Sequence, residues 1–83
     1  MNKVLVKVFF PKINEQYEIW IPLNKKVYSV ITLILKGINE LHYDIYKFEK
    51  LPALYDRITG NQYQLDNYIQ DTDIRNGSEL III

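Results

Sequence analysis

Apolar residues recur at every second position near the start of the chain, which is typical of a β-strand with one buried face. From residue 3 to residue 10, one face carries Val4, Val6, Val8 and Phe10, and the other carries Lys3, Leu5, Lys7 and Phe9. A second alternating run follows a turn at residues 11–14, with Tyr17, Ile19 and Ile21 on one face and Glu18 and Trp20 on the other. The pattern therefore predicts a β-hairpin that ends near Pro22.

The period becomes helical after this hairpin. Between residues 27 and 41, apolar side chains fall on an arc roughly 140° wide at 100° per residue. They are Val27, Val30, Ile31, Ile34, Leu35, Ile38 and Leu41, and Leu33 is the apolar exception on the polar side. Asn24 is the expected N-cap, since its side chain can accept a bond from the first turn. Gly37 is expected to weaken the helix by roughly 1 kcal/mol relative to alanine, with fraying over residues 37–41.

The second half of the chain has shorter signals. Residues 42–50 have no cleanly apolar parity and are interpreted as an irregular connection. The segments 51–57 and 61–65 are predicted to be short strands around a turn at residues 59–61, and residues 66–77 a loop with one helical turn. Asn76 and Gly77 can supply a positive φ before a final strand at residues 80–83.

This order predicts an α+β fold. The last run, Leu80, Ile81, Ile82 and Ile83, has no polar alternation, as expected of a central strand flanked on both sides and packed on both faces. Placed parallel to the first strand, it gives a mixed sheet crossed by one amphipathic helix, which is the β-grasp arrangement. With 83 residues and 48% hydrophobic content, the chain is expected to form a single domain over residues 1–83.

Composition excludes several classes of function. The chain has no cysteine, and 10 Lys and Arg balance 10 Asp and Glu. Zero net charge argues against nucleic acid as a partner, although the first fifty residues sum to +3 and the remainder to −3. Lys7 and Pro11 interrupt the first apolar run, so no export signal is expected. Lys36 and Gly37 interrupt the apolar segment 27–41, so no direct membrane insertion is expected.

No constellation of catalytic or metal-binding residues emerges. His42 is the only histidine and is interpreted as a surface residue. The three acids of the late loop, Asp66, Asp71 and Asp73, lack the spacing of a calcium loop and are interpreted as turn and cap residues. Ser29 and Ser78 have no evident base. We therefore predict no enzyme, no metal site and no cofactor.

The whole chain resembles the ubiquitin-like superfamily in its opening hairpin, its helix after "IPLN" and its closing segment "LDNYIQDTDIRNGSELIII". The spacing of Ile74, Gly77 and Leu80 is similar to that in the YukD/EsaB-like proteins of Gram-positive bacteria. The resemblance implies a cytosolic accessory or regulatory protein of a type VII secretion system. Related domains in actinobacteria are fused to a membrane component of such systems.

One feature differs from ubiquitin and from the sulfur carriers of the same fold. Those proteins use a flexible Gly-Gly tail that reaches into an activating enzyme. Here the last residue is Ile83, so we expect no conjugation; the YukD-like proteins also lack the tail. The alternative is a ubiquitin-like modifier or sulfur-carrier protein that is activated at its C-terminus.

Parity also predicts a protein-binding face. If the even positions of the first strand face the helix, then Leu5, Phe9, Trp20, Ile81 and Ile83 lie on the other side of the sheet. Ubiquitin-like proteins commonly use this face for recognition, so we expect protein partners there, including components of the secretion system. Two alternatives stay open: Lys3, Lys7, Glu18 and the loops could cover the face, or the chain could associate with itself.

Overall fold

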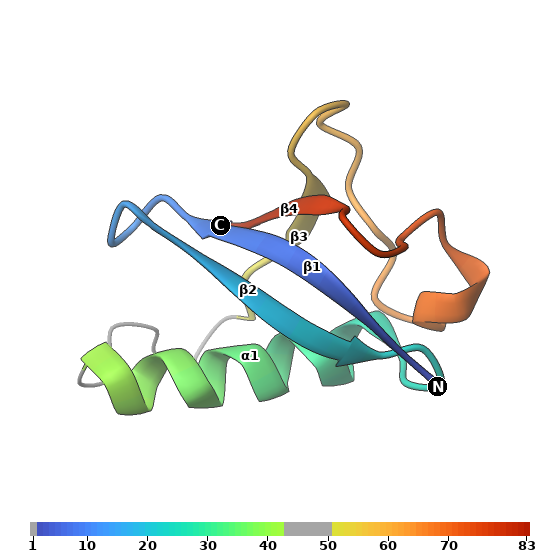
Figure 1. Ribbon diagram of the computed structural model, residues 1–83, viewed down its shortest axis with the longest axis horizontal. Helices are drawn as coiled ribbons and strands as arrows, with labels where there is room; N and C mark the ends of the chain where they lie inside the picture. Colours follow the sequence, from blue (N-terminus) through green and yellow to red (C-terminus); the bar gives the residue numbers. More distant parts are fainter. Residues whose placement is uncertain (1, 43–50) are drawn as a thin grey trace.

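A computed structural model of the chain describes residues 2–42 and 51–83. Its strands form one four-stranded sheet in the order β2-β1-β4-β3, and helix α1 packs across one side of it (Figure 1). The elements are β1 (Lys3–Phe10), β2 (Glu15–Pro22), α1 (Val27–His42), β3 (Leu54–Asp56), the 3-10 helix η1 (Ile69–Asp71) and β4 (Glu79–Ile82). β1 and β4 are parallel and central, which confirms the predicted β-grasp arrangement.

The hairpin of β1 and β2 is antiparallel, with Lys3 opposite Pro22 and Phe10 opposite Glu15. Its turn contains Asn14 at a φ of 52°, a left-handed conformation that asparagine tolerates better than most residues. The predicted strand pair and its turn are therefore confirmed.

The turn before β4 is attached directly to β1. Gly77 has a φ of 86°, and its N–H donates to the Leu5 carbonyl at 2.9 Å. The Leu5 N–H in turn donates to Asn76 Oδ1 at 2.8 Å. The predicted positive φ at Gly77 is confirmed, and these bonds fix where β4 begins beside β1.

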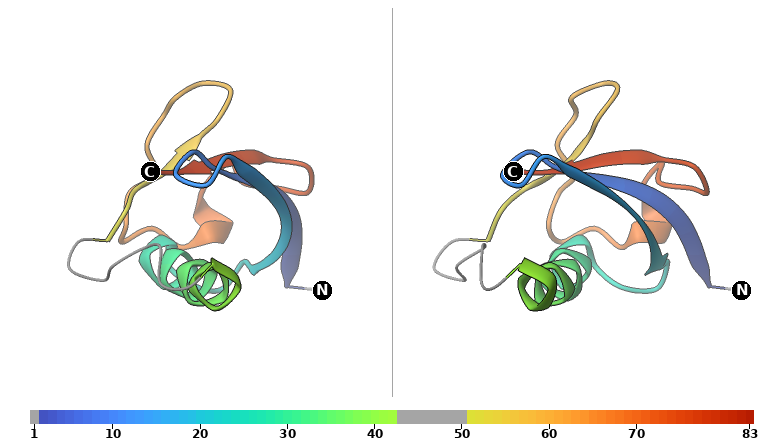
Figure 2. Two further views of the ribbon diagram at one scale, coloured as in Figure 1. Left: turned by 90° about the vertical axis from the view of Figure 1, so that its left-hand side faces the viewer. Right: turned by 60° about the vertical axis from the view of Figure 1, so that its left-hand side comes forward.

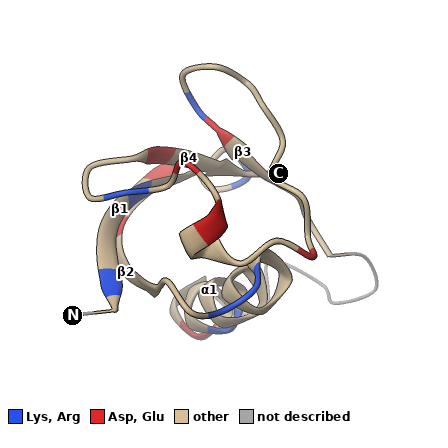
Figure 3. Cartoon of the chain, turned by 90° about the vertical axis from the view of Figure 1, so that its right-hand side faces the viewer, with Lys and Arg blue, Asp and Glu red and all other residues tan. Residues whose placement is uncertain are grey.

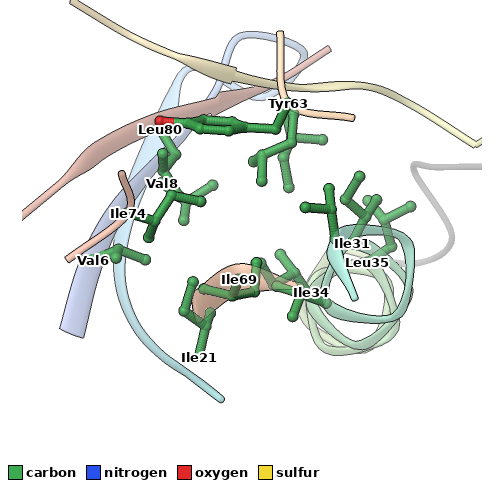
Figure 4. Packing of buried hydrophobic residues seen from close by; sticks show 14 of the residues in the cluster. Val6, Val8, Ile21, Ile31, Ile34, Leu35, Tyr63, Ile69, Ile74 and Leu80 are labelled. Carbon is green, nitrogen blue, oxygen red and sulfur yellow. The ribbon is translucent and has the colours of Figure 1, made fainter. Parts of the chain in front are cut away.

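The core lies between the sheet and α1 (Figure 4). Val6 and Val8 of β1 and Leu80 of β4 face Ile31 and Leu35 of the helix across this space. The even positions of β1 are all buried, as the alternation predicted. The helical arc is confirmed for Val27, Val30, Ile31, Ile34, Leu35 and Ile38, but it was wrong for Leu41, which is 64% exposed because it lies in the last turn of α1.

The start of α1 differs from the prediction. The helix begins at Val27, so Asn24 lies outside the N-cap position and the expected cap was wrong. The Val27 N–H instead donates to the Asn67 carbonyl at 2.8 Å, and the Tyr28 N–H donates to the Leu65 carbonyl at 3.2 Å. These two N–H groups of the first helical turn are therefore bonded by carbonyl groups of residues 65–67 and not by a capping side chain.

The segment after β3 also differs. Residues 61–65 do not form a strand; Gln62 makes an isolated bridge to Tyr55. Asp56 Oδ1 accepts bonds from the N–H groups of Ile58 and Thr59 at 2.8 and 3.0 Å, which stabilises the turn after β3. η1 confirms the predicted helical turn in residues 66–77. The helix includes His42, and the rest of the predicted connection, residues 43–50, lies outside the described residues.

Candidate protein-binding face

The side of the sheet that faces away from α1 is called the open face below. α1 and η1 both lie on the opposite side in Figure 2. The strand register places Leu5 opposite Trp20, and Phe9 opposite Ile81, whose other neighbour is Tyr55. These odd positions of β1 and β4 and even positions of β2 therefore occupy the open face, as the parity argument requires.

A charged row crosses the open face between these apolar pairs. Lys7 is opposite Glu18 on one side and Glu79 on the other. Figure 3 shows acidic and basic positions close together on the strands. The row separates Leu5 and Trp20 from Phe9 and Ile81, so the face carries two apolar patches rather than one.

The first of these, the Trp20 patch, consists of Leu5 and Trp20. Trp20 is 54% exposed, and Leu5 is partly buried. Together with Lys7, Glu18, Asn76 and Gly77, these two residues line an open pocket of about 260 Å³. Leu5 and Trp20 form the apolar wall of this pocket, and Lys7, Glu18 and Asn76 form a polar rim.

The second patch, called the Phe9 patch, consists of Phe9 and Ile81. The side chain of Arg57 covers its Phe9 ring. The Arg57 guanidinium carbon lies 4.4 Å from the Phe9 ring centroid, and Nη1 donates to Gln16 Oε1 at 2.7 Å. Arg57 thus reaches from the end of β3 across the sheet to β2. The expected alternative, a charged side chain over the face, occurs at Phe9, although the side chain is Arg57 rather than Lys3, Lys7 or Glu18.

Ile83 lies apart from both patches. Its side chain is 60% exposed. Its N–H and carbonyl bond to the carbonyl and N–H of Ala53 at 3.2 and 2.9 Å, which prolongs the pairing of β3 with β4. The register with β1 ends at Ile81, so Ile83 stands beyond the Phe9 patch. The five predicted residues therefore do not form one cluster, and their role in binding stays a prediction.

Other candidate residues have structural partners. Tyr17 Oη and His42 Nε2 are 2.8 Å apart, which connects β2 with the end of α1. Ser78 Oγ accepts a bond from the Arg75 N–H at 2.9 Å within the turn before β4. Within residues 2–42 and 51–83, no group of three or more His, Cys, Asp or Glu side chains could hold a metal ion.

Sequence reasoning did not identify the polar cluster around Tyr63. Its hydroxyl donates to Asp73 Oδ1 at 2.7 Å and lies 3.3 Å from Asp56 Oδ2. Burial and the bond to Asp73 raise the pKa of the Tyr63 hydroxyl above its ordinary value. Bonds from the backbone N–H groups of Thr59 and Ile58 hold the pKa of Asp56 below its ordinary value. The cluster joins β3 to the late loop, and only the tertiary fold brings its members together.

Comparisons with known proteins show the fold. No family model and no curated protein matches the sequence. A chain of the MycP5-free ESX-5 inner membrane complex is similar, with a TM-score of 0.79 and 18% identity; the match covers 100% of this chain and 21% of that chain. The ubiquitin-like domain of the Mycobacterium tuberculosis type VII secretion system protein EccD1 has a TM-score of 0.75 and 15% identity, with 100% and 99% covered.

The same fold occurs in a different setting. A chain of the toluene 4 monooxygenase HD complex has a TM-score of 0.80 and 11% identity, with 96% of this chain and 95% of that chain covered. Identities this low establish the ubiquitin-like fold and nothing finer. In the part of the chain that the structure describes, no helix is long and apolar enough to cross a membrane.

Proposed function

We propose that this chain is a non-enzymatic, ubiquitin-like accessory or regulatory protein of a bacterial type VII-like secretion system. It acts in the cytoplasm through protein contacts on the open face. The observation that carries the proposal is the likeness of the whole chain to the EccD1 ubiquitin-like domain, with 99% of that domain covered. The YukD/EsaB-like spacing of Ile74, Gly77 and Leu80 supports the same assignment.

The Trp20 patch is the proposed anchor point. Burying a large apolar side chain contributes roughly 1.5–3 kcal/mol, and tryptophan is enriched among the residues that dominate binding energy. Trp20 is 54% exposed in this chain, so about half of this contribution is still available to a partner. The charged row beside it supplies the polar rim that interfaces usually have.

The side-chain contacts favour binding over catalysis. A nucleophilic hydroxyl needs a base within hydrogen-bond reach. Here His42 contacts Tyr17, and the Ser78 hydroxyl is bonded to a backbone N–H. These contacts support a role in which the surface, and not a reactive group, carries the function.

Affinity capture from cells that carry a type VII secretion system tests the proposal. The wild-type chain should retain components of that system. Trp20→Ala and Ile81→Glu should each bind them with at least tenfold lower affinity, which corresponds to about 1.4 kcal/mol of binding free energy. Leu41→Glu is the matched control, because Leu41 is 64% exposed on α1, across the sheet from the open face. Circular dichroism should show that all three variants are folded.

Two results would contradict the proposal. Equal capture by wild type and folded Trp20→Ala and Ile81→Glu would exclude the open face. An adduct on the Ile83 carboxylate after incubation with lysate and ATP, detected by mass spectrometry, would favour the modifier or sulfur-carrier alternative instead.

A further inference from the structure

Within residues 2–42 and 51–83, no strand lies beside the outer edge of β2. The Leu23 N–H donates to the Asn2 carbonyl at 2.7 Å and continues the β1–β2 ladder. Hydrogen-bonded pairs alternate in an antiparallel ladder, so the odd residues of β2 bond to β1. The N–H and carbonyl groups of Gln16, Glu18 and Trp20 therefore point outward.

The bonds of β1 agree with this assignment. Its odd residues face β4, since the Leu5 carbonyl accepts from Gly77 and the Lys7 N–H donates to the Ser78 carbonyl, both at 2.9 Å. Its even residues must then face β2. In the register, these even residues pair with the odd residues of β2.

The opposite edge of the sheet is covered. The Tyr63 N–H donates to the Leu54 carbonyl at 2.9 Å, and the Asp56 N–H donates to the Asn61 carbonyl at 2.8 Å. Residues 61–63 thus occupy the outer side of β3. Among residues 2–42 and 51–83, β2 provides the one uncovered edge of this sheet.

We propose that two copies of this chain associate by antiparallel pairing of their β2 strands around a two-fold axis at Ile19. A single available edge favours a closed pair, because a sheet that is covered at its other edge cannot add further copies. Zero net charge removes whole-molecule repulsion between the copies. The proposal concerns the sheet edge and does not depend on the proposed function of the open face.

The side chains of β2 select this register. Facing positions must have the same parity, so the axis falls on a residue. An axis at Glu18 would place the two Glu18 carboxylates directly opposite each other, which is unfavourable. An axis at Trp20 would set Glu18 opposite Pro22, which has no N–H to donate, and would leave Trp20 opposite Trp20 as the one complete hydrogen-bonded pair. An axis at Tyr17 would set Trp20 opposite Asn14, which lies in the hairpin turn with a φ of 52°. An axis at Ile19 sets Glu18 opposite Trp20 of the second copy, and both residues can exchange two backbone bonds.

The same register covers an apolar groove. A hollow of about 150 Å³ lies between β2 and α1 and is lined by Ile19, Trp20, Ile21, Pro22, Val30, Leu33 and Ile34. Leu33 on its helical side is 56% exposed. The second copy would bring its own Ile19 and Leu33 to this groove, since the two-fold axis passes through Ile19. Backbone pairing and apolar burial therefore occur together.

Sedimentation velocity from roughly 1 μM to roughly 1 mM tests the association. The expected result is a concentration-dependent shift from the monomer mass of 9.9 kDa to twice that mass. Glu18→Pro should abolish the shift, because it removes an outward N–H without removing a bond to β1. Glu18→Gln keeps the N–H and is the matched control that should still dimerise.

Cross-linking tests the register without relying on a proline variant. The chain has no cysteine, so Ile19→Cys introduces the sole thiol. Ile19 would face Ile19 as a non-hydrogen-bonded pair with Cα atoms about 4.5 Å apart, within the Cα–Cα range of disulfides, so a mild oxidant such as diamide should give covalent dimers of Ile19→Cys. Gln16→Cys should not link to itself, because residue 16 faces residue 22 in the proposed register.

Three results would overturn the inference. They are a monomer at every concentration, a dimer that persists in folded Glu18→Pro, or equal cross-linking of Ile19→Cys and Gln16→Cys. Ile81→Glu should leave the dimer intact, so failure of this inference and failure of the proposed open-face function are distinguishable.

Discussion

Replacing Tyr63 by phenylalanine would test the polar cluster that joins β3 to the late loop. The ring is 91% buried, since its exposure is 9%, and phenylalanine would keep that packing. The lost bond is the 2.7 Å donation to Asp73. Bonds to charged groups contribute about 1.5–3 kcal/mol, and because Asp73 is exposed and can rebind water we expect the low end, about 1.5 kcal/mol. For a domain of this size, Tm should fall by about 6–12 °C.

Two groups of this cluster give the stability of the fold a pH dependence with a defined sign. The folded-state pKa of Tyr63 is raised above 10.0, so its contribution is present below pH 10.0 and is lost at higher pH. The folded-state pKa of Asp56 is lowered below 3.8, so its contribution is present above pH 3.8 and is lost as the pH falls further. The backbone N–H bonds of Thr59 and Ile58 cause most of the Asp56 shift and persist in Tyr63→Phe, so wild type and variant should both lose stability between pH 7 and pH 3.

Guanidinium denaturation followed by circular dichroism at pH 7 and pH 3 would measure the difference. Tyr28→Phe is the matched control, because Tyr28 is 45% exposed and removing its hydroxyl should change the unfolding free energy by less than about 0.5 kcal/mol. Equal losses in the two variants at pH 7, or a wild type whose unfolding free energy does not fall between pH 7 and pH 3, would refute the reasoning.

The remaining predictions concern unfolding free energies from the same assay. Gly37→Ala should stabilise the chain by roughly 0.5–1 kcal/mol, because the added Cβ meets no atom within 4 Å and alanine favours the helix. Gly77→Ala should destabilise it by about 1–2 kcal/mol, because φ is +86° there; equal effects of the two changes would contradict this. Asn24→Ala should cost under about 0.5 kcal/mol, and a loss near 1 kcal/mol would mean that Asn24 caps the helix after all. Leu80→Ala should cost about 2–5 kcal/mol, and a loss below 1 kcal/mol would contradict its central place in the core.

The strands and the helix face could be predicted because their signals are local. Val4, Val6 and Val8 alternate with partly or fully exposed residues, and a period of two has no helical interpretation. The beginning of α1 could not be predicted in the same way. Asn24 satisfies the local rule for a cap, but the first N–H groups bond to Leu65 and Asn67 carbonyls about forty residues away in sequence.

The sequence could predict which strand residues lie on the open face, but not which of them other side chains cover. Parity assigns Phe9 and Trp20 to the same side of the sheet, whatever the loops do. Whether each stays accessible depends on long side chains from distant positions. Arg57 lies 48 residues after Phe9, and its N–H donates to the Glu79 carbonyl at 2.9 Å, so it continues β3 beside β4 and its side chain reaches the Phe9 ring on β1.

The closing run of four apolar residues shows why such a strand need not be buried on both faces. Leu80 and Ile82 are fully buried beneath α1, whereas Ile81 is partly buried and Ile83 is 60% exposed. Burial in the core explains only the first pair. Ile81 has Phe9 and Tyr55 as neighbours on the open face, so cross-strand packing accounts for part of its apolar character.

Ile83 has no such neighbour in the register with β1. We propose that a contact with another protein explains why an apolar residue occupies this exposed position. A fold-stability measurement on Ile83→Lys separates the two causes: an unchanged unfolding free energy with weaker partner capture would support the contact, and a loss above about 1 kcal/mol would assign Ile83 to the fold itself.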